Sequence, residues 1–476
     1  MSKKVLLTFM ILACFLSCKL KSEKDESTTN DVISSMEKAK LSGVIYEANI
    51  RQYSSEGTFK ALTRDIPKIK ELGVKYVWLM PIFPISQAKR KATGGIFVSE
   101  LDNEEDKAKM RGSYYAVADY KGINENFGSI YDFRELVRTI HDNEMYVILD
   151  WVPNHTGWDH PWITNRPEYY TKNENGEITD PLNPDGTSMG WNDVADLNYN
   201  NPELRKDMIE SMKHWVVNEG VDGFRCDVAG SVPLDFWEAA IPELRKEKEL
   251  FMLAEAWEPE LMSEDLFDMV YSWGTHHLMN NIVSGENNVL DWDERMKEID
   301  SIYHDQGILM NFITNHDENS WNGTISERLG EGTDIFTVLS YLTPGMPLIY
   351  SGQEYGLSHR LKFFEKDSIP KTQGEEWQLL SKLGMIKRKH ESLFADSSKA
   401  NYSKLTSSSP EEVLAFKRSR NSDAIIFIGN LSNRKVNFIP DFHCVGLDVF
   451  TNEEIKFSKR SNYELKPWEF IVLKQS

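Results

Sequence analysis

Arg225 and Asp227 stand two residues apart in the apolar segment 221–228, which is flanked by Gly220 and Gly230. Such a segment is typical of a short buried strand, on which residues two apart point to the same side. A buried charge needs a partner, so a purely structural ion pair is one interpretation. The other is that Arg225 holds Asp227 ionised as a nucleophile, and that chemistry requires a second carboxyl group close by.

Candidates for the second carboxyl group follow three other apolar segments, at the point where each segment ends. They are Asp150 and His155 at and after residues 146–150, Glu255 after residues 250–254, and His316 and Asp317 after residues 308–314. A single Asp or His in such a place is more often a loop cap or a satisfied core residue. Four segments that each deliver a carboxylate or a histidine favour a shared site, because active sites of barrels lie at the carboxyl ends of the strands.

Three carboxylates without a Ser or Cys nucleophile motif favour glycoside hydrolysis. In that reaction one carboxylate attacks the anomeric carbon and another transfers protons. The proton donor needs a raised pKa, and neighbouring negative charge raises it. A divalent metal site is the rival interpretation, because His and carboxylate side chains also bind metals. The zinc motif His-Glu-x-x-His is absent from the sequence.

The segments that carry these residues belong to an alternation of apolar strands and amphipathic helices. Strands are predicted at residues 43–50, 74–80, 146–150, 221–228, 250–254, 268–273, 308–314 and 346–350. Helices are predicted at residues 58–72, 129–143, 202–220, 236–246, 292–304, 335–342 and 377–390. Eight strands that alternate with helices in this way predict an α/β fold, a (β/α)8 TIM barrel. An open doubly wound sheet is the alternative, but no Gly-rich phosphate loop follows the first strand.

Irregular insertions and a change from helical to strand-like sequence pattern set the predicted domain boundaries. Residues 82–128 are irregular, and residues 153–201 are predicted to be an inserted loop domain after the third strand; insertions of this length are usually functional. Short strands with turn residues between them replace the helical period late in the chain. Residues 395–476 are therefore predicted to be a C-terminal antiparallel β domain of the sandwich type. The catalytic barrel is expected to span residues 42–394.

The N-terminal residues are typical of an export signal and a tether. Two lysines precede an apolar run too short to span a bilayer, which predicts a signal peptide over residues 1–17. Leu16-Ser17-Cys18 is similar to a bacterial lipoprotein cleavage box, so lipid on Cys18 is expected to attach the protein to a membrane. The polar residues 18–41 are expected to be a flexible tether. An outer-membrane lipoprotein on the periplasmic or surface face is predicted, with a plain secretory signal as the alternative.

Charge and cysteine content narrow the range of partners. The 476-residue chain has a formal net charge of −20, which argues against nucleic acid. Cys14 lies in the predicted signal peptide, and Cys18 is expected to carry lipid. Cys226 and Cys444 are therefore expected to be free thiols and not part of a disulfide framework.

The motifs resemble those of the α-amylase family, glycoside hydrolase family 13. In order along the chain they are Asp150-Trp-Val-Pro-Asn-His155, Gly223-Phe-Arg-Cys-Asp227, Glu255 and Asn315-His-Asp317. Residues 112–120 with Phe127-Gly128 are similar to the family's stretch before the third strand, and Gly352-Gln-Glu354 to its eighth-strand ending. The resemblance covers about residues 42–476.

The resemblance implies catalytic roles for Asp227, Glu255 and Asp317, and it places Arg225 with the binding residues. Asp227 would be the nucleophile and Glu255 the general acid and base. Asp317 would hold sugar hydroxyl groups and favour the distorted transition state, and Arg225 would keep Asp227 ionised. Asp150 also matches, but it is chiefly structural in the family.

The resemblance also implies how substrate is bound. Tyr115 would stack on the face of the sugar at the cleavage point, where His155 and His316 would donate hydrogen bonds. The implied partner is an α-glucan or maltooligosaccharide, and the chemistry itself requires no cofactor.

One departure from the family concerns calcium. Many members continue the nucleophile motif with a Lys-His pair, in which the Lys contacts sugar and the His carbonyl helps bind calcium. Here Gly230 and Ser231 hold those positions. The metal ligands are therefore unknown, with a structural calcium in doubt and Asn154 and Asp196 as candidates.

Three functions agree with these motifs. The first is a retaining hydrolase of α-1,4-glucosidic bonds in starch-type glucans or maltooligosaccharides. The second is a transglycosylase, a glucanotransferase on the same substrates, since the same two carboxylates perform both reactions. The third is a non-catalytic glycan-binding subunit, which would be expected to lack one of the three carboxylates.

Overall fold

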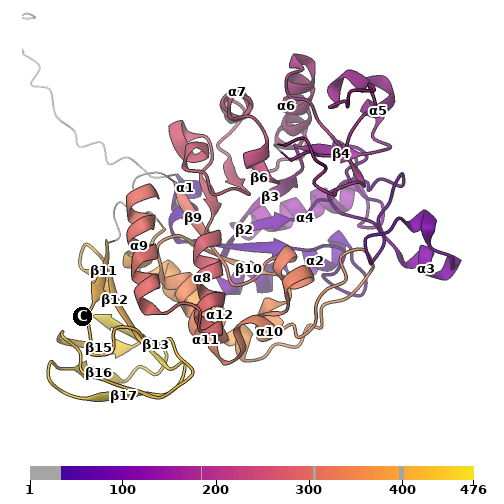
Figure 1. The fold of residues 1–476 in the computed structure, drawn as a ribbon. Helices are drawn as coiled ribbons and strands as arrows, with labels where there is room; N and C mark the ends of the chain where they lie inside the picture. The colour runs from indigo at the N-terminus through magenta and orange to yellow at the C-terminus, as the bar shows by residue number, and fades with distance from the viewer. Residues whose placement is uncertain (1–33, 184, 304–306, 396–400, 476) are drawn as a thin grey trace, which may run out of the picture. The chain divides into compact units, whose positions relative to one another are not determined.

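The fold is a closed barrel, as the alternation of strands and helices predicts. The structure, a computed structural model, describes residues 34–183, 185–303, 307–395 and 401–475. Eight parallel strands close in the order β1, β10, β9, β8, β7, β6, β3, β2 (Figure 1). They are β1 (Val44–Ala48), β2 (Val74–Leu79), β3 (Tyr146–Trp151), β6 (Gly223–Cys226), β7 (Phe251–Ala254), β8 (Met269–Tyr271), β9 (Ile308–Asn311) and β10 (Met346–Tyr350).

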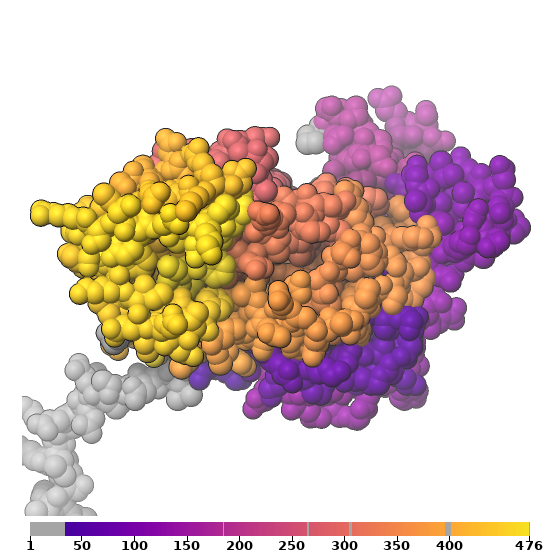
Figure 2. Space-filling view, turned by 90° about the horizontal axis from the view of Figure 1, so that it is seen from below, coloured from indigo at the N-terminus to yellow at the C-terminus, as the bar shows by residue number. Residues whose placement is uncertain are grey.

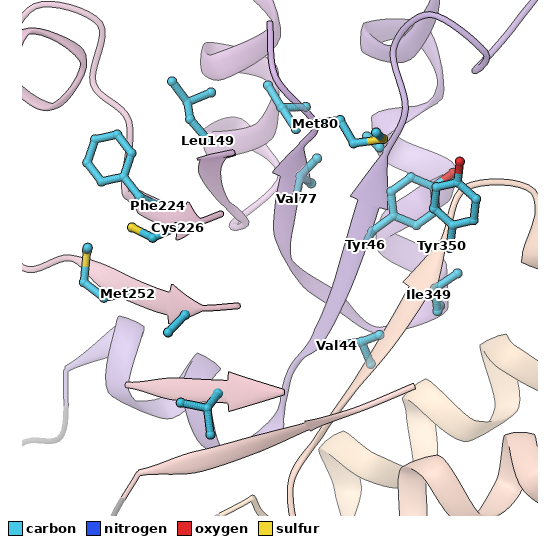
Figure 3. Close-up of a cluster of buried hydrophobic side chains, with 14 of the residues drawn as sticks. Val44, Tyr46, Val77, Met80, Leu149, Phe224, Cys226, Met252, Ile349 and Tyr350 are labelled. Atoms are coloured by element: carbon cyan, nitrogen blue, oxygen red, sulfur yellow. The ribbon is translucent and has the colours of Figure 1, made fainter. Parts of the chain in front are cut away.

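Helices lie outside the strands and share a core with them. They include α2 (Phe59–Ile69), α4 (Ile130–Asp142), α6 (Pro202–Val217), α7 (Leu234–Arg245), α8 (Trp273–Ser284), α9 (Val289–Tyr303), α11 (Thr333–Leu342) and α12 (Glu375–Lys389). Strand residues alternate between two buried clusters, as the pleat requires. One cluster joins side chains such as Val44, Tyr46 and Val77 to the helices (Figure 3). The other, with Ile45, Tyr76 and Trp78, fills the barrel.

Local sequence features fix where these elements begin. Ser129 caps α4 in a reciprocal pair with Asp132, which confirms the predicted N-cap. Pro202 occupies the first turn of α6, where its missing N–H costs nothing. Gly223 opens β6 at φ +155°, and a Cβ there would lie 1.8 Å from the carbonyl oxygen of Phe251. Only glycine allows β6 and β7 to approach so closely, and this approach places Arg225 and Glu255 side by side.

The two insertions contain short elements of their own. Residues 82–128 include α3 (Glu104–Lys109). In residues 153–201, β4 (His155–Gly157) pairs antiparallel with β5 (Val194–Asp196), and α5 (Pro161–Asn165) lies between them in the chain. The pairing of His155 with Asp196 closes the second insertion back onto the end of β3.

The helix α1 (Ser35–Ser42) differs from the flexible tether expected at residues 18–41. Met36 and Ala39 are buried in the same cluster as barrel residues, and the hydroxyl of Tyr76 donates a hydrogen bond to the carbonyl of Met36. Burial of these apolar side chains orders a segment whose composition is otherwise polar. The predicted signal peptide and Cys18 lie outside the described residues.

The C-terminal strands form the predicted antiparallel β domain. One sheet has the order β11 (Asn401–Leu405), β12 (Val413–Arg420), β13 (Asp423–Asn430), β18 (Phe470–Gln475), β15 (Cys444–Asp448), β16 (Glu454–Phe457), and a second pairs β14 (Val436–Phe438) with β17 (Tyr463–Leu465). Figure 2 shows this yellow region beside orange segments of the barrel. Buried Arg418 donates hydrogen bonds to the carbonyls of Leu342 and Phe394, which ties the sheet to the barrel's last units.

Cysteines and hydropathy add two facts about the described residues. Cys226 and Cys444 are buried free thiols there, as expected. None of the helices in the described ranges is long and apolar enough to cross a membrane.

Candidate active site

The residues singled out from the sequence gather at the carboxyl ends of the barrel strands. A cavity of about 310 Å³ lies there, and six of the seven candidates line it: Tyr115, His155, Asp227, Glu255, His316 and Asp317. The seventh, Arg225, is fully buried beneath it. Asp317 is the most accessible of the three carboxylates, with 36% of its side chain exposed against 11% for Asp227 and 16% for Glu255.

Arg225 contacts three carboxyl groups at once. Its Nη1 donates to Asp150 at 2.8 Å and to Asp227 at 2.9 Å, and its Nη2 lies 2.9 Å from Glu255 Oε2. The Nε donates to the hydroxyl of Tyr271 at 3.1 Å. A guanidinium offers donors in a fixed planar fork, so it sets the relative positions of the carboxyl groups as well as neutralising them.

The environment makes Glu255 a suitable proton donor. Burial raises its pKa, Arg225 opposes that effect, and the charge of Asp227 adds to it. Burial also raises the pKa of Asp227, while the adjacent Arg225 guanidinium and a hydrogen bond with the Glu255 carboxyl group lower it. The two carboxyl groups thus share one guanidinium and influence each other's charge, and such a pair suits the sharing of acid and nucleophile roles.

His316 is held as a cation between acidic groups. Burial lowers its pKa, but Asp317 and Glu47 outweigh burial and raise the pKa to about 9. Its Nδ1 lies 2.5 Å from Glu47 Oε1, and its Nε2 lies 2.7 Å from the Tyr115 hydroxyl. The Tyr115 and His316 rings stack with their centroids 5.5 Å apart. This arrangement fixes the Tyr115 ring beside the cavity, where it also stacks with Phe363, and gives His316 donor character.

His155 differs from His316 in being neutral. Burial lowers its pKa to about 4. Its ring meets the edge of Trp191 at a centroid distance of 5.8 Å. The cavity therefore holds one protonated and one neutral histidine at neutral pH.

Backbone strain occurs directly after Asp227. Val228 has φ 37° and ψ 46°, a left-handed conformation that β-branched residues rarely adopt. The same residue donates its backbone N–H to Glu255 Oε2 at 2.8 Å. Strain of this kind persists where the surroundings enforce it, often at active sites. It aims an N–H at the carboxyl group of Glu255.

Several residues that line the cavity or contact the site residues beneath it were not predicted from the sequence. Glu47, Trp78 and Tyr271 lie within β1, β2 and β8, and contact the site from below. Lys91 and Asp193, from the two insertions, form an ion pair at 3.1 Å at the cavity wall. Trp321, Phe363 and Phe364 form an aromatic cluster there, and Trp321 is 51% exposed. Nothing in the periodicity of irregular loops marks such residues.

The candidate calcium ligands Asn154 and Asp196 both lie beside His155. The amide of Asn154 lies 3.3 Å from His155 Nδ1, and Asp196 pairs with His155 between β4 and β5. Burial raises the pKa of Asp196 to about 6. The described residues contain no group of three or more His, Cys, Asp or Glu side chains that could hold a metal ion.

Comparison with known proteins gives a consistent result. The family model of the α-amylase catalytic domain matches residues 22–178 and 188–404. α-Amylase 3 of Dictyoglomus thermophilum is 26% identical over 349 residues, 66% of this chain and 64% of that protein. A 4-α-glucanotransferase of Thermotoga neapolitana is 27% identical over 66% of this chain and 71% of its own length. The crystal structure of a maltogenic α-amylase from Thermotoga neapolitana has a TM-score of 0.78 and 29% identity, covering 91% of this chain and 98% of that one.

Proposed function

Because the chain belongs to the α-amylase family, glycoside hydrolase family 13, we propose that it cleaves α-1,4-glucosidic bonds of starch-type glucans or maltooligosaccharides with retention of anomeric configuration. Membership of this family implies glycosidase or glycosyl-transfer chemistry. The linkage, the substrate and the use of water as acceptor are our proposal.

The reaction proceeds in two displacements. Asp227 attacks the anomeric carbon while Glu255 donates its proton to the glycosidic oxygen, which breaks the carbon–oxygen bond and leaves a glycosyl ester on Asp227. Glu255 then takes a proton from water, whose oxygen attacks the same carbon and releases Asp227.

The remaining side chains bind and orient the sugar. Asp317 accepts hydrogen bonds from sugar hydroxyl groups, and Tyr115 stacks on the ring face. The imidazolium of His316 donates a hydrogen bond at the cleavage point, and His155 forms another. Charge that develops in the transition state meets donors already in place, which is the arrangement that contributes most to catalysis.

The observation that most supports this proposal is the position of Asp227 and Glu255 on one guanidinium, with a carboxyl oxygen of each 2.9 Å from a terminal nitrogen of Arg225. An inverting enzyme leaves about 6.5–9.5 Å between its carboxyl groups for a water molecule, whereas direct attack needs about 5–5.5 Å. Two carboxyl groups held by the two terminal nitrogens of one guanidinium favour the second arrangement.

Transfer to a sugar acceptor is the second candidate function. The aromatic cluster of Trp321, Phe363 and Phe364 beside the cavity offers ring faces on which an acceptor sugar could stack. The similarity to a 4-α-glucanotransferase favours the same idea.

One digest separates these functions. We expect maltoheptaose to yield shorter oligosaccharides of α configuration. Proton NMR in the first minutes measures the configuration, and chromatography measures the product lengths. Products longer than the substrate would establish transfer, and β-configured products would exclude the proposed double displacement. Metal analysis before and after treatment with a chelator would show whether calcium is bound.

We further propose that lipid on Cys18 anchors the protein to the outer membrane. Cys18→Ala is expected to move the protein from the membrane fraction to the soluble fraction while specific activity stays unchanged, because the catalytic residues lie in the barrel. The measurement is fractionation without detergent, with Cys444→Ala as the control. Wild-type protein in the soluble fraction would contradict the anchor. Protease treatment of intact cells would distinguish the surface face from the periplasmic face.

A further inference from the structure

A second cavity, of about 670 Å³, lies beside the catalytic one and is rich in cations. It is lined by loops that follow β1 and β2 and by the loop at residue 366. Its charged lining residues are Arg51, Arg90, Arg111, Lys366, Glu56 and Glu125. We call it the basic cavity. Four cations around one cavity are unexpected in a chain with a net charge of −20.

Carboxylates do not neutralise these cations. None of the four takes part in an ion pair with a described residue, and their hydrogen bonds end on neutral acceptors. Arg51 donates to the carbonyls of Gly112 and Phe363, Arg90 to the side-chain oxygen of Gln87, Arg111 to the carbonyl of Ala108, and Lys366 to the carbonyl of Ser54. Glu56 pairs instead with Arg64, which is outside the lining. The cavity therefore carries excess positive charge.

Arg51 is the most unusual of the four. Only 4% of the residue is exposed, and its Nη2 has no hydrogen-bond partner among the described residues. The guanidinium lies 3.8 Å from the centre of the Tyr114 ring, a favourable contact that leaves the charge unpaired. An unpaired buried charge is costly, and a bound anion would relieve that cost. Burial and the positive charge of Arg111 both lower the pKa of Arg51, so these two cations repel each other.

We propose that the basic cavity binds a phosphoryl group, either as free phosphate or as the ester of a sugar. A phosphoryl group carries a charge of about −1.5 to −2 and three acceptor oxygens. Guanidinium forks match those oxygens in pairs, and a lysine adds a point charge. The volume exceeds that of phosphate alone, so an attached sugar fits.

Occupancy would reach the catalytic cavity through Arg51. Its Nη1 holds the carbonyls of Gly112 and Phe363, and the backbone N–H of Arg111 donates to the carbonyl of Phe364. The same two loops place Tyr115, Phe363 and Phe364 on the wall of the catalytic cavity. An anion on Arg51 is therefore expected to stiffen this wall and to alter KM more than kcat.

Calorimetric titration at constant ionic strength tests the site without using activity. Inorganic phosphate is expected to bind saturably to the wild type at one site. R90A/R111A is expected to weaken that binding about a hundredfold, roughly tenfold for each charged hydrogen bond removed. Arg111 is exposed and Arg90 is partly exposed, and neither side chain forms an ion pair with a described residue, so the fold should persist, as a thermal melt would show. K107A/K109A on α3 removes the same charge outside the cavity and should bind as the wild type does.

The ligand form follows from a second titration. Glucose 6-phosphate that binds tighter than inorganic phosphate, and loses that binding in R90A/R111A, would identify a sugar ester; equal affinities would identify free phosphate. Absence of saturable phosphate binding in the wild type, or equal binding by wild type and R90A/R111A, would overturn the proposal. Since the readout is heat of binding, failure of the hydrolase proposal would leave this result unaffected.

Discussion

Asparagine in place of Asp227 is expected to lower turnover of maltooligosaccharides by roughly four to six powers of ten, the loss that follows removal of a nucleophile. The amide matches the carboxylate in size, and its oxygen can still accept the hydrogen bond from Arg225. What disappears is the negative charge that attacks the anomeric carbon. The measurement is the initial rate on maltoheptaose, with a thermal melt to show that the fold is intact.

Asp235→Asn is the matched control, because it makes the same chemical change on the exposed first turn of α7. It should retain wild-type turnover. If Asp227→Asn instead kept more than a hundredth of wild-type turnover while Asp235→Asn behaved normally, another group would have to be the nucleophile.

Glutamine in place of Glu255 is expected to affect two substrates differently. Hydrolysis of a natural glucan should fall by roughly 10²–10⁴-fold, because the leaving oxygen no longer receives a proton. The first step on α-maltosyl fluoride should persist, since fluoride departs without a proton. The second step still needs Glu255 to take a proton from water, so the glycosyl ester on Asp227 accumulates. The expected signal is a burst of fluoride equal to the enzyme concentration, followed by slow release.

Glu298→Gln provides the comparison for this variant. Glu298 lies on the surface of α9 with about half of its side chain exposed, so both substrates should react as with the wild type. Equal losses on the glucan and on the fluoride, without a burst, would show that Glu255 is not the proton donor.

Much of the fold could be predicted because burial on both faces gives barrel strands continuous apolar runs. The bounds of all eight strands lie within two residues of such runs, apart from the end of β9, which comes three residues earlier than predicted. The helix α8 was missed, since its sequence Trp273–Ser284 is rich in His and Asn and lacks a side-chain cap. The helix α1 was missed for a different reason: only the barrel it packs against reveals its apolar side.

The residues predicted for the site lie together in the structure where chemistry coincides with a strand end. Asp227, Glu255 and Asp317 stand out in sequence because charged residues interrupt an apolar pattern there. Glu47 also interrupts a strand, yet its partner His316 is 269 positions away, and sequence spacing gives no sign of that contact. Lys91 and Asp193 belong to two irregular insertions, so only the folded chain shows that they meet.

The shared contacts of Arg225 affect how the strand ends tolerate substitution. Because one guanidinium contacts Asp150, Asp227 and Glu255, a substitution there removes the counter-charge of all three, and their tolerance of mutation is interdependent. Changes at these strand ends are therefore expected to be non-additive. The parts of residues 82–128 and 153–201 that lie away from the cavity do not share this dependence. Substitutions there are expected to be tolerated singly, so the outer loops could vary while the barrel and its charged strand ends stay the same.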